Sequence, residues 1–382
     1  MSGEVAPETL DAVRVRLARD GGALTPDRIA RALRAEGRPV GDATVLAVHD
    51  ALRRDVDGAG PLEPLLALPG VTDVLVNGAG QVWLDRGGGL ELTAVRFADD
   101  EAVRRLAQRL AASAGRRLDD ATPYADLRLP GGIRFHAVLA PVSRPGTVLS
   151  LRVPGSRSFD LAGLGRAGLL EADAQRVLAR IVHARCSFLV TGGTGSGKTT
   201  LLNALLGEVD QAERIVLVED AGELRPSHPH VIGLEARPPN LEGTGEITVR
   251  TLVRQALRMR PDRLVVGEVR GAEVVDLLAA MNTGHEGGCG TVHANSAADV
   301  PARIESLATA AGLGRLAAHS QLASAVDVVV HLDRDRRGVR RLREIGVLAR
   351  EGDLVAVTPA LAFPVGRVVE GPGVARLEEL LG

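Results

Sequence analysis

Hydrophobic positions recur at different spacings along this chain, and the changes in spacing divide it into segments. In residues 1–60 apolar side chains stand three or four positions apart, as at Leu10, Val13 and Leu17. This spacing is typical of amphipathic helices. Thr25 followed by proline has the form of a helix start. We therefore expect a helical N-terminal extension.

From residue 61 the pattern changes to alternation. Val71–Val76 and Gln81–Leu84 alternate apolar with polar residues on either side of Asn77-Gly78, which predicts a β-hairpin. An amphipathic helix is expected around Val103, Leu106 and Leu110. Two further strands are expected at 133–139 and at 147–153. Together these elements predict a small mixed α/β, PAS-like domain over 61–157, closed by a Pro- and Gly-containing linker.

Nearly continuous apolar runs alternate with helical patterns over residues 158–335. Such strands are typical of a parallel sheet that is covered on both faces. The expected strands are 187–190, 214–218, 263–266, 290–293 and 326–332, and the expected helices are 199–206, 249–259, 272–281 and 300–311. Beyond them, 336–382 is expected to form a C-terminal β appendage that ends in a weak helix at 374–381. The predicted fold class is α/β.

A glycine-rich segment joins the first apolar strand of this third region to a helix. Gly192, Gly197, Lys198 and Thr199 satisfy the pattern G-x-x-x-x-G-K-[ST]. Its backbone N–H groups can wrap a phosphate chain at a helix N-terminus. The candidate nucleotide-binding residues are Gly193, Thr194, Gly195, Ser196, Gly197, Lys198, Thr199 and Thr200. We expect ATP with Mg²⁺, with Lys198 on the β- and γ-phosphates and Thr199 on the metal.

The alternative is that the motif is a chance match in a chain with 45 glycines. The distribution of lysine and arginine argues against that alternative. The chain has 46 lysines and arginines, and Lys198 is the only lysine among them. Arginine is a planar fork, whereas lysine is a compact charge on a flexible stem. Because arginine serves everywhere else, the lysine at this position indicates a chemical requirement.

Composition limits the remaining classes of function. The formal net charge of −2 gives no sign of a polyanionic partner, and only 2% aromatic residues disfavours a single-stranded nucleic-acid channel without excluding it. Two cysteines, Cys186 and Cys289, cannot form a disulfide framework. We find no secretory signal and no apolar run that could cross a bilayer. The expected location is cytoplasmic, with at most peripheral membrane contact.

Acidic residues follow two of the predicted strands. Glu219, Asp220 and Glu223 follow one, and Glu268 ends another. Carboxyl ends of parallel strands line the ligand crevice of such sheets, so these acids would face the nucleotide. Glu268 is the candidate to polarise the attacking water, and Glu219 is the candidate second Mg²⁺ ligand. The alternative is that they are surface acids at strand ends.

Two histidines, His285 and His293, flank a glycine-rich turn before a short strand. A structural zinc site is disfavoured because neither cysteine lies in a C-x-x-C pair. Cys289 as a nucleophile is weakly supported, since no base is implied. Histidines beside a γ-phosphate could donate hydrogen bonds and sense hydrolysis.

Taken in order, these motifs carry a family resemblance. The phosphate loop, Glu219-Asp220-x-x-Glu223-Leu224, Gly267-Glu268-x-Arg270 and the segment from Thr283 to Asn295 resemble the type II/type IV secretion ATPase superfamily. Within it the chain is most similar to Tad/Flp pilus and conjugal-transfer-associated ATPases. The likeness extends N-terminally through Val71–Gly78, Leu129–Arg134 and Ser150–Arg152, and so covers about residues 60 to 335.

The resemblance implies a hexameric ring at the inner face of the cell membrane, working on a polytopic inner-membrane platform protein. It implies an N-terminal α/β domain hinged to a RecA-like P-loop ATPase domain. It places Glu219 and Glu223 in an Asp box, Glu268 at the Walker B position, and His285 and His293 in a His box. It also implies that Arg134 and Arg152 approach the nucleotide when the domains close, although both could be ordinary surface charges.

Three functions follow as alternatives. The first is an ATP-hydrolysing motor of a Tad/Flp-type pilus or related secretion system. The second is a DNA-transfer ATPase of a conjugation-like machine. The third is a nucleotide-binding scaffold with little turnover, which the presence of both Lys198 and Glu268 disfavours. The absence of a tetracysteine module disfavours the general-secretion branch, and we expect Cys289 to be a packing residue.

Overall fold

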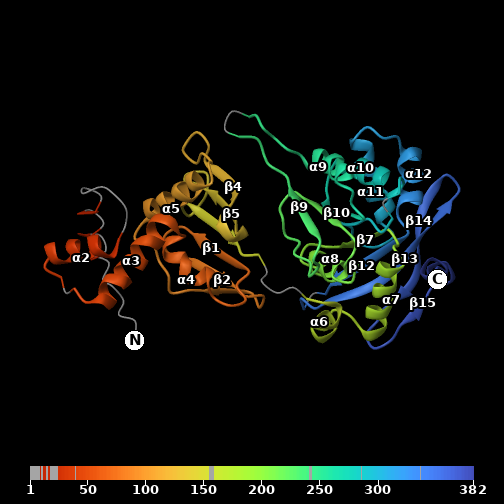
Figure 1. Cartoon of the computed structure of the whole chain (residues 1–382), viewed down its shortest axis with the longest axis horizontal. Coiled ribbons are helices and arrows are strands. Elements are labelled where there is room, and N and C mark those ends of the chain that lie inside the picture. Colours follow the sequence, from red (N-terminus) through yellow and green to blue (C-terminus); the bar gives the residue numbers. More distant parts are fainter. Residues whose placement is uncertain are drawn as a thin grey trace. The chain divides into compact units, whose positions relative to one another are not determined.

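The computed structural model describes residues 9, 12–13, 16–17, 25–38, 40–154, 159–240, 243–284, 286–335 and 337–382. The chain divides into two compact units, Met1–Ser156 and Arg157–Gly382 (Figure 1). Each unit has its own hydrophobic core, so each can be described by itself.

The N-terminal unit begins with helices, as the apolar spacing predicts. The helices are α2 (Pro26–Ala35) and α3 (Asp42–Asp57). A small core of Val13, Ile29, Leu33, Val48 and Leu52 joins them. Leu10, which belongs to the predicted pattern, lies outside the described residues. Short turns of helix, η1 (Gly60–Leu62) and α4 (Glu63–Leu66), lead into the sheet of this unit.

That sheet has six strands in the order β3-β2-β1-β6-β5-β4, and every neighbouring pair is antiparallel. The elements are β1 (Asp73–Asn77), β2 (Val82–Asp85), β3 (Leu90–Leu92), α5 (Asp100–Ser113), β4 (Tyr124–Arg128), η2 (Pro130–Gly132), β5 (Arg134–Val138) and β6 (Val148–Arg152). The predicted hairpin is confirmed as β1 and β2. Apolar residues of α5, including Val103 and Leu110, share a core with Val74, Phe135 and Leu151 of the strands.

The C-terminal unit contains a nine-stranded sheet in the order β15-β14-β13-β12-β7-β11-β10-β8-β9. Its strands are β7 (Phe188–Gly192), β8 (Ile215–Glu219), β9 (Val231–Glu235), β10 (Arg263–Val269), β11 (Cys289–Val292), β12 (Val328–Arg334), β13 (Arg340–Glu351), β14 (Leu354–Ala362) and β15 (Val369–Glu370). From β12 to β9 all neighbours are parallel, and from β15 to β12 they are antiparallel.

Helices pack on this sheet as the continuous apolar strands predict. They are α6 (Leu161–Arg166), α7 (Ala172–His183), α8 (Lys198–Leu206), α9 (Val249–Ala256) with η3 (Leu257–Met259), α10 (Glu273–Met281), α11 (Val300–Ala310), α12 (Arg315–Ala325) and α13 (Val374–Leu381). Phe188 and Val190 belong to one core cluster and Leu189, between them, to another. Alternate residues of β7 therefore face two separate cores, so both faces of the sheet are covered.

The structure differs from the sequence-based expectation at several elements. β3, β4, α6, α7, β9 and α12 were not among the predicted elements. Residues 336–382, expected as an appendage, instead continue the large sheet through β13 and β14. Leu342, Ile345 and Leu361 lie in the same core as β7 because the alternating pattern of these strands turns one side inward.

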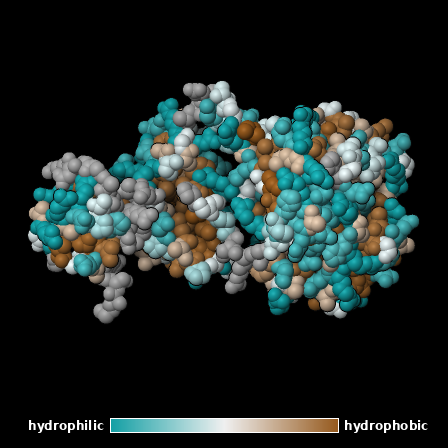
Figure 2. All heavy atoms as spheres, viewed as in Figure 1, coloured by the Kyte–Doolittle hydropathy of each residue, from teal (hydrophilic) through white to brown (hydrophobic). Residues whose placement is uncertain are grey.

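The visible surface of the large unit is mostly polar, with apolar residues in small scattered groups (Figure 2). Among the described residues, no helix combines the length and the apolar composition that a bilayer crossing needs.

Candidate active site

The glycine-rich segment adopts the strand, loop and helix arrangement that its motif requires. β7 is buried throughout and ends at Gly192, and α8 begins at Lys198. A Cβ atom on Gly192 would collide with the carbonyl oxygen of Leu332 and lie 2.6 Å from Oγ of Ser196. Gly197 caps α8 in a left-handed conformation with φ 101°. The motif glycines therefore meet a steric demand, as well as leaving the loop open to a ligand.

Lys198 lies within this loop rather than extending into solvent. Its Nζ donates hydrogen bonds to the carbonyl oxygens of Gly192, at 2.9 Å, and Gly193, at 3.0 Å. Burial lowers the pKa of Lys198, and the negative charge of Glu268 acts in the opposite direction. The only lysine of the chain and the candidate catalytic acid thus interact electrostatically within one unit.

Ser196 provides a test of whether this loop fits a phosphate. Its side chain is 1% exposed, and within the described residues its hydroxyl has no hydrogen-bond partner. A buried, unsatisfied hydroxyl beside backbone N–H groups at a helix N-terminus matches the acceptor oxygens of a phosphate. Thr194 and Gly195 are exposed, and Thr199 and Thr200 are partly buried in the first turn of α8. These residues fit a nucleotide phosphate chain.

Glu268 lies at an irregularity in its strand. The register between β10 and β11 shifts between Val266 and Val269, which places Gly267 and Glu268 in a bulge. The hydroxyl of Thr291 on β11 donates to the carbonyl oxygen of Gly267 at 2.7 Å. Bulges redirect side chains and occur often beside active sites. The bulge thus sets the direction in which Glu268 leaves the sheet.

Arg270 is a site residue that the motif contained but that sequence reasoning assigned no role. Its guanidinium donates to Oε2 of Glu268 at 2.6 Å and to Oδ2 of Asp220 at 2.9 Å. The hydrogen bond to Glu268 raises the pKa of Arg270. Arg270 therefore joins Asp220, which follows β8, to Glu268 near the end of β10, and it holds the Glu268 carboxylate in place.

Glu219 is buried at the end of β8, and its carboxylate organises the following turn. Oε1 accepts the N–H groups of Glu223, at 2.8 Å, and Leu224, at 3.0 Å. Burial raises the pKa of Glu219, and these two hydrogen bonds oppose that effect. A Cβ on Gly267 would lie 2.7 Å from Cγ of Glu219, so the glycine of the Walker B segment makes room for this acid.

The donor set for Mg²⁺ is consistent with this geometry. Thr199 offers a hydroxyl, and Glu219 keeps Oε2 beyond its two backbone bonds. Hard oxygen donors of this kind suit Mg²⁺, which usually keeps several waters and binds substrate phosphates. In the described residues no cluster of three or more His, Cys, Asp or Glu side chains could form a metal cage. The roles of Thr199 and Glu219 at the metal stay predictions.

Of the two predicted histidines, His293 is partly buried directly after β11, and His285 lies outside the described residues. β11 runs between β7 and β10 in the sheet, so its carboxyl end lies between the phosphate loop and Glu268. Cys289 is fully buried in the core, which confirms it as a packing residue. A histidine that sequence reasoning missed, His331, shares a 2.7 Å hydrogen bond with Thr191 at the base of the loop.

Arg134 and Arg152 stand directly opposite each other on β5 and β6. Nε of Arg152 donates to Oδ1 of Asp73 at 3.0 Å. Both arginines belong to the N-terminal unit, whereas the phosphate loop belongs to the other. Their approach to the nucleotide stays a prediction.

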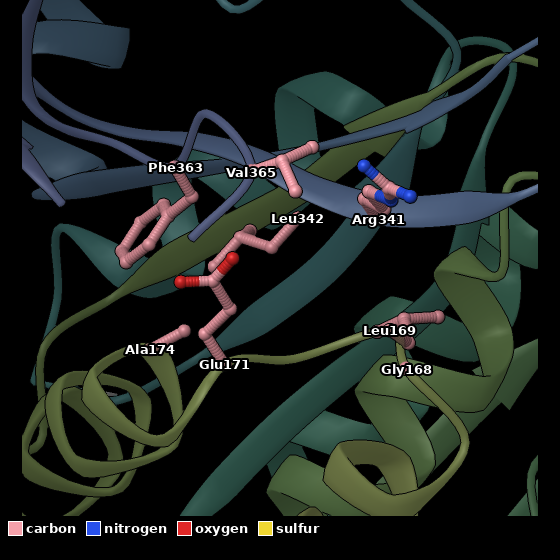
Figure 3. A pocket seen from close by; sticks show the side chains of 8 residues that line it. All are labelled: Gly168, Leu169, Glu171, Ala174, Arg341, Leu342, Phe363 and Val365. Carbon is pink, nitrogen blue, oxygen red and sulfur yellow. The ribbon is translucent and has the colours of Figure 1, made fainter. Parts of the chain in front are cut away.

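A cavity of about 200 Å³ lies between the α6–α7 connection, β13 and the segment that follows β14 (Figure 3). Leu169 lines it, and the Leu169 side chain lies 3.2 Å from the place where Gly197 would carry a Cβ. Its acid, Glu171, accepts the N–H of Gly366 at 3.0 Å. Leu169 therefore packs against the end of the phosphate loop at Gly197.

Comparison with known proteins places this site in a family. The family model described as type II/IV secretion system protein matches residues 55–344. The chain belongs to the type II/IV secretion system protein family. The sequence resemblance to this superfamily is thereby confirmed, and the matched region includes the phosphate loop, Glu219, Glu268 and both N-terminal arginines.

Two groups of relatives illustrate the likeness. The chain is 60% identical over 326 residues to a putative conjugal transfer protein of Mycobacterium tuberculosis, which covers 84% of this chain and 93% of the relative. It is 33% identical over 319 residues to the type IV secretion system protein PtlH of Bordetella pertussis, covering 76% and 94%.

Solved structures support the fold. The pilus retraction motor PilT with bound ADP matches with a TM-score of 0.53 and 20% identity, over 84% of each chain. The ATPase DotB of Legionella pneumophila matches with a TM-score of 0.53 and 20% identity, over 75% of this chain and 79% of DotB. The predicted fold class, a RecA-like ATPase domain preceded by an α/β domain, is confirmed.

Proposed function

We propose that this protein is an ATP-hydrolysing motor of a Tad/Flp-type pilus or a related type II/IV secretion system. The observation that carries the proposal is the juxtaposition of Lys198 and Glu268. Lys198 is held in a phosphate loop, Glu268 leaves a bulge two strands away, and the negative charge of Glu268 acts to raise the pKa of Lys198. A cradle alone would only bind nucleotide, whereas a cradle with a positioned acid can also hydrolyse it.

The proposed roles follow from these positions. The loop N–H groups and Lys198 bind the β- and γ-phosphates, and the Ser196 hydroxyl gains a partner there. Thr199 and Glu219 would hold Mg²⁺ when it is bound with the nucleotide, and the ion would supply charge neutralisation to the phosphates. Glu268 orients and polarises the attacking water, and Arg270 keeps its carboxylate pointing in one direction. Glu223, His285 and His293 complete the contacts around the phosphates.

We further propose that turnover is coupled to movement of the N-terminal unit. Arg134 and Arg152 would reach the phosphates when the units close and withdraw after hydrolysis. In a homo-hexameric ring at the inner face of the cell membrane, this motion would act on a polytopic membrane partner. This ring and its membrane partner are the specific form that the first candidate function takes in a Tad/Flp-type pilus.

The second candidate, a DNA-transfer ATPase of a conjugation-like machine, has support of its own. The relative at 60% identity carries the name putative conjugal transfer protein. The scarcity of aromatic residues, at 2%, argues against direct contact with single-stranded nucleic acid but not against work beside it. ATPase rates measured with and without DNA, together with the mass of the assembly, distinguish these functions.

The direct test of the proposed function is Glu268→Gln. The amide keeps the size of the side chain but cannot polarise water, so kcat should fall by about 10²–10⁴ while ATP still binds. Glu246→Gln, a change at an exposed loop residue, is the matched control. Turnover in Glu268→Gln equal to that of the control would overturn the assignment. Wild-type protein that binds ATP without hydrolysing it would instead support the scaffold.

A further inference from the structure

The hairpin between β12 and β13 comes directly against the phosphate loop. β12 is the parallel neighbour of β7, and Leu332 pairs with Gly192 where the loop begins. The chain then turns between Arg334 and Arg340, which are partners across the two strands. Oδ1 of Asp335 accepts the N–H groups of Arg337 and Val339, each at 2.9 Å, which fixes the turn. The described residues of the hairpin are therefore held against the start of the phosphate loop by strand pairing and by these hydrogen bonds.

Two arginines of this hairpin lie against the loop. Nε of Arg340 donates to the carbonyl oxygen of Gly195 at 2.8 Å. Nη1 of Arg334 lies 3.2 Å from the place where Gly195 would carry a Cβ. The most exposed glycine of the phosphate loop is thus flanked by two guanidinium groups from outside the motif.

Arg334 and Arg340 carry like charges at directly opposite positions of the two strands. Like charges directly opposite each other on antiparallel strands are destabilising. Both side chains are exposed, and in the described part of the chain neither forms an ion pair with a carboxylate. Arg340 uses one of its five N–H donors on Gly195, which leaves the others available. An anion at the loop would complement both groups.

The order of the strands decides which part of a nucleotide they would meet. β12 lies on one side of β7, and β11 and β10, with Glu268, lie on the other. Glu268 must face the γ-phosphate to activate water, so the hairpin approaches the phosphate chain from the opposite side. The phosphates on that side, away from the γ-phosphate, are present in both ATP and ADP.

We propose that Arg334 is a nucleotide-binding residue that contacts the diphosphate portion of bound ATP or ADP. We also propose that Arg340 is a positioning residue that holds the Gly195 carbonyl and so shapes the loop. This inference rests on the proposed nucleotide-binding function. It assigns to the β12–β13 hairpin a cationic clamp that is carried by the same unit as the phosphate loop.

The test measures nucleotide affinity and turnover separately in the full chain. A fluorescent N-methylanthraniloyl ADP, with competition by ADP and ATP, gives Kd for wild type, Arg334→Ala, Arg340→Ala and Arg340→Lys. Arg337→Ala is the control, because it removes an equal charge from the same hairpin without touching the loop. Loss of one charge-assisted hydrogen bond should raise Kd for ADP and ATP alike by about tenfold in Arg334→Ala.

The remaining outcomes separate the possibilities. Arg340→Ala should also raise Kd, and Arg340→Lys should recover part of the affinity, because an ammonium can donate to the same carbonyl. In Arg334→Ala the KM for ATP and the Kd for ADP should rise by similar factors, since the proposed contact is to the diphosphate portion that both nucleotides share. If Arg334→Ala and Arg340→Ala both bind ADP as tightly as Arg337→Ala, the clamp is overturned. If wild type binds no nucleotide, the proposed function is overturned as well.

Discussion

Each unit of this chain contains two arginines that face each other across antiparallel strands, and the two pairs have different surroundings. Arg134 and Arg152 face each other on β5 and β6, and Arg152 is paired with Asp73. Arg334 and Arg340 face each other on β12 and β13, and Arg340 is bonded to the phosphate loop itself. The first pair is attached to its own sheet, and the second is attached to the nucleotide site.

From this difference we predict two separate effects of substitution. Arginines fixed beside the loop contribute at every stage of the cycle, so their effect should be on affinity for ATP and ADP alike. Arginines carried by another unit can contribute only in the closed arrangement, so their effect should be on turnover. The same residue type would thus serve binding in one sheet and coupling in the other.

The largest expected effect belongs to Lys198, on which both contributions depend. In the proposed function Lys198 binds two phosphates, so Lys198→Ala should weaken ATP binding by about 10²–10⁴. Lys198→Arg keeps the charge and tests the geometry, since a planar fork cannot replace a point charge in this loop. Titration of a fluorescent nucleotide measures both variants. An unchanged Kd for ATP in Lys198→Ala would contradict nucleotide binding by the phosphate loop, on which the comparison of the two arginine pairs depends.

A smaller effect is expected from the N-terminal arginines. Arg134→Ala and Arg152→Ala should each lower kcat by about 10–10² while Kd for ADP stays near that of wild type. Arg105→Ala, which removes an exposed arginine of α5, is the control. Steady-state ATPase rates, compared with the Kd values for ADP, show whether these arginines affect turnover or binding. Full turnover in both variants would contradict the proposed approach of Arg134 and Arg152 to the nucleotide.

The smallest expected effect concerns the rate at which the two cysteine thiols are alkylated, and it gives information on the C-terminal unit alone. Cys186 and Cys289 both lie in the C-terminal unit, and burial raises their pKa values from 9.0 to about 11 and about 12. Folded protein at pH 8 should therefore react with iodoacetamide far more slowly than a free thiol. Rapid labelling of native protein would show that the core around β7 opens.

These pKa shifts also fix the direction of a pH effect. The unfolded chain loses its thiol protons near pH 9, whereas the folded chain keeps them until higher pH. The folded form then binds more protons, so the stabilising contribution is present below pH 9 and is lost as the pH rises further. Thermal melts monitored by thiol labelling and by circular dichroism, at pH 7 and pH 10, separate this unit from the rest of the chain.

The sequence predicted those parts of the site whose residues are contiguous. The phosphate loop and Glu268 each follow an apolar strand, so motif and strand pattern support each other. Arg270, His331 and the hairpin arginines act through strand register, which brings Leu332 beside Gly192 although 140 positions separate them. A pattern of residue types gives no information about such pairing.

Missed elements have a similar physical explanation. α12 buries Ala318, His319, Leu322 and Ala325, a face of mostly small or polar side chains that lacks a strong apolar stripe. His319 is satisfied there by Glu305 and by the N–H of Val355, so tertiary contacts rather than hydrophobicity hold it. β9 is an edge strand with no fully buried residue, and it therefore lacks the apolar run of the strands inside the sheet.

The single lysine gives the phosphate loop a built-in reporter. A protease that cuts only after lysine has one target bond in the whole chain, between Lys198 and Thr199, at the first residue of α8. Cleavage there requires the loop and the helix start to open, and a bound nucleotide would hold both closed. The rate at which two fragments appear would follow the opening of this one loop in the intact assembly, with no label attached.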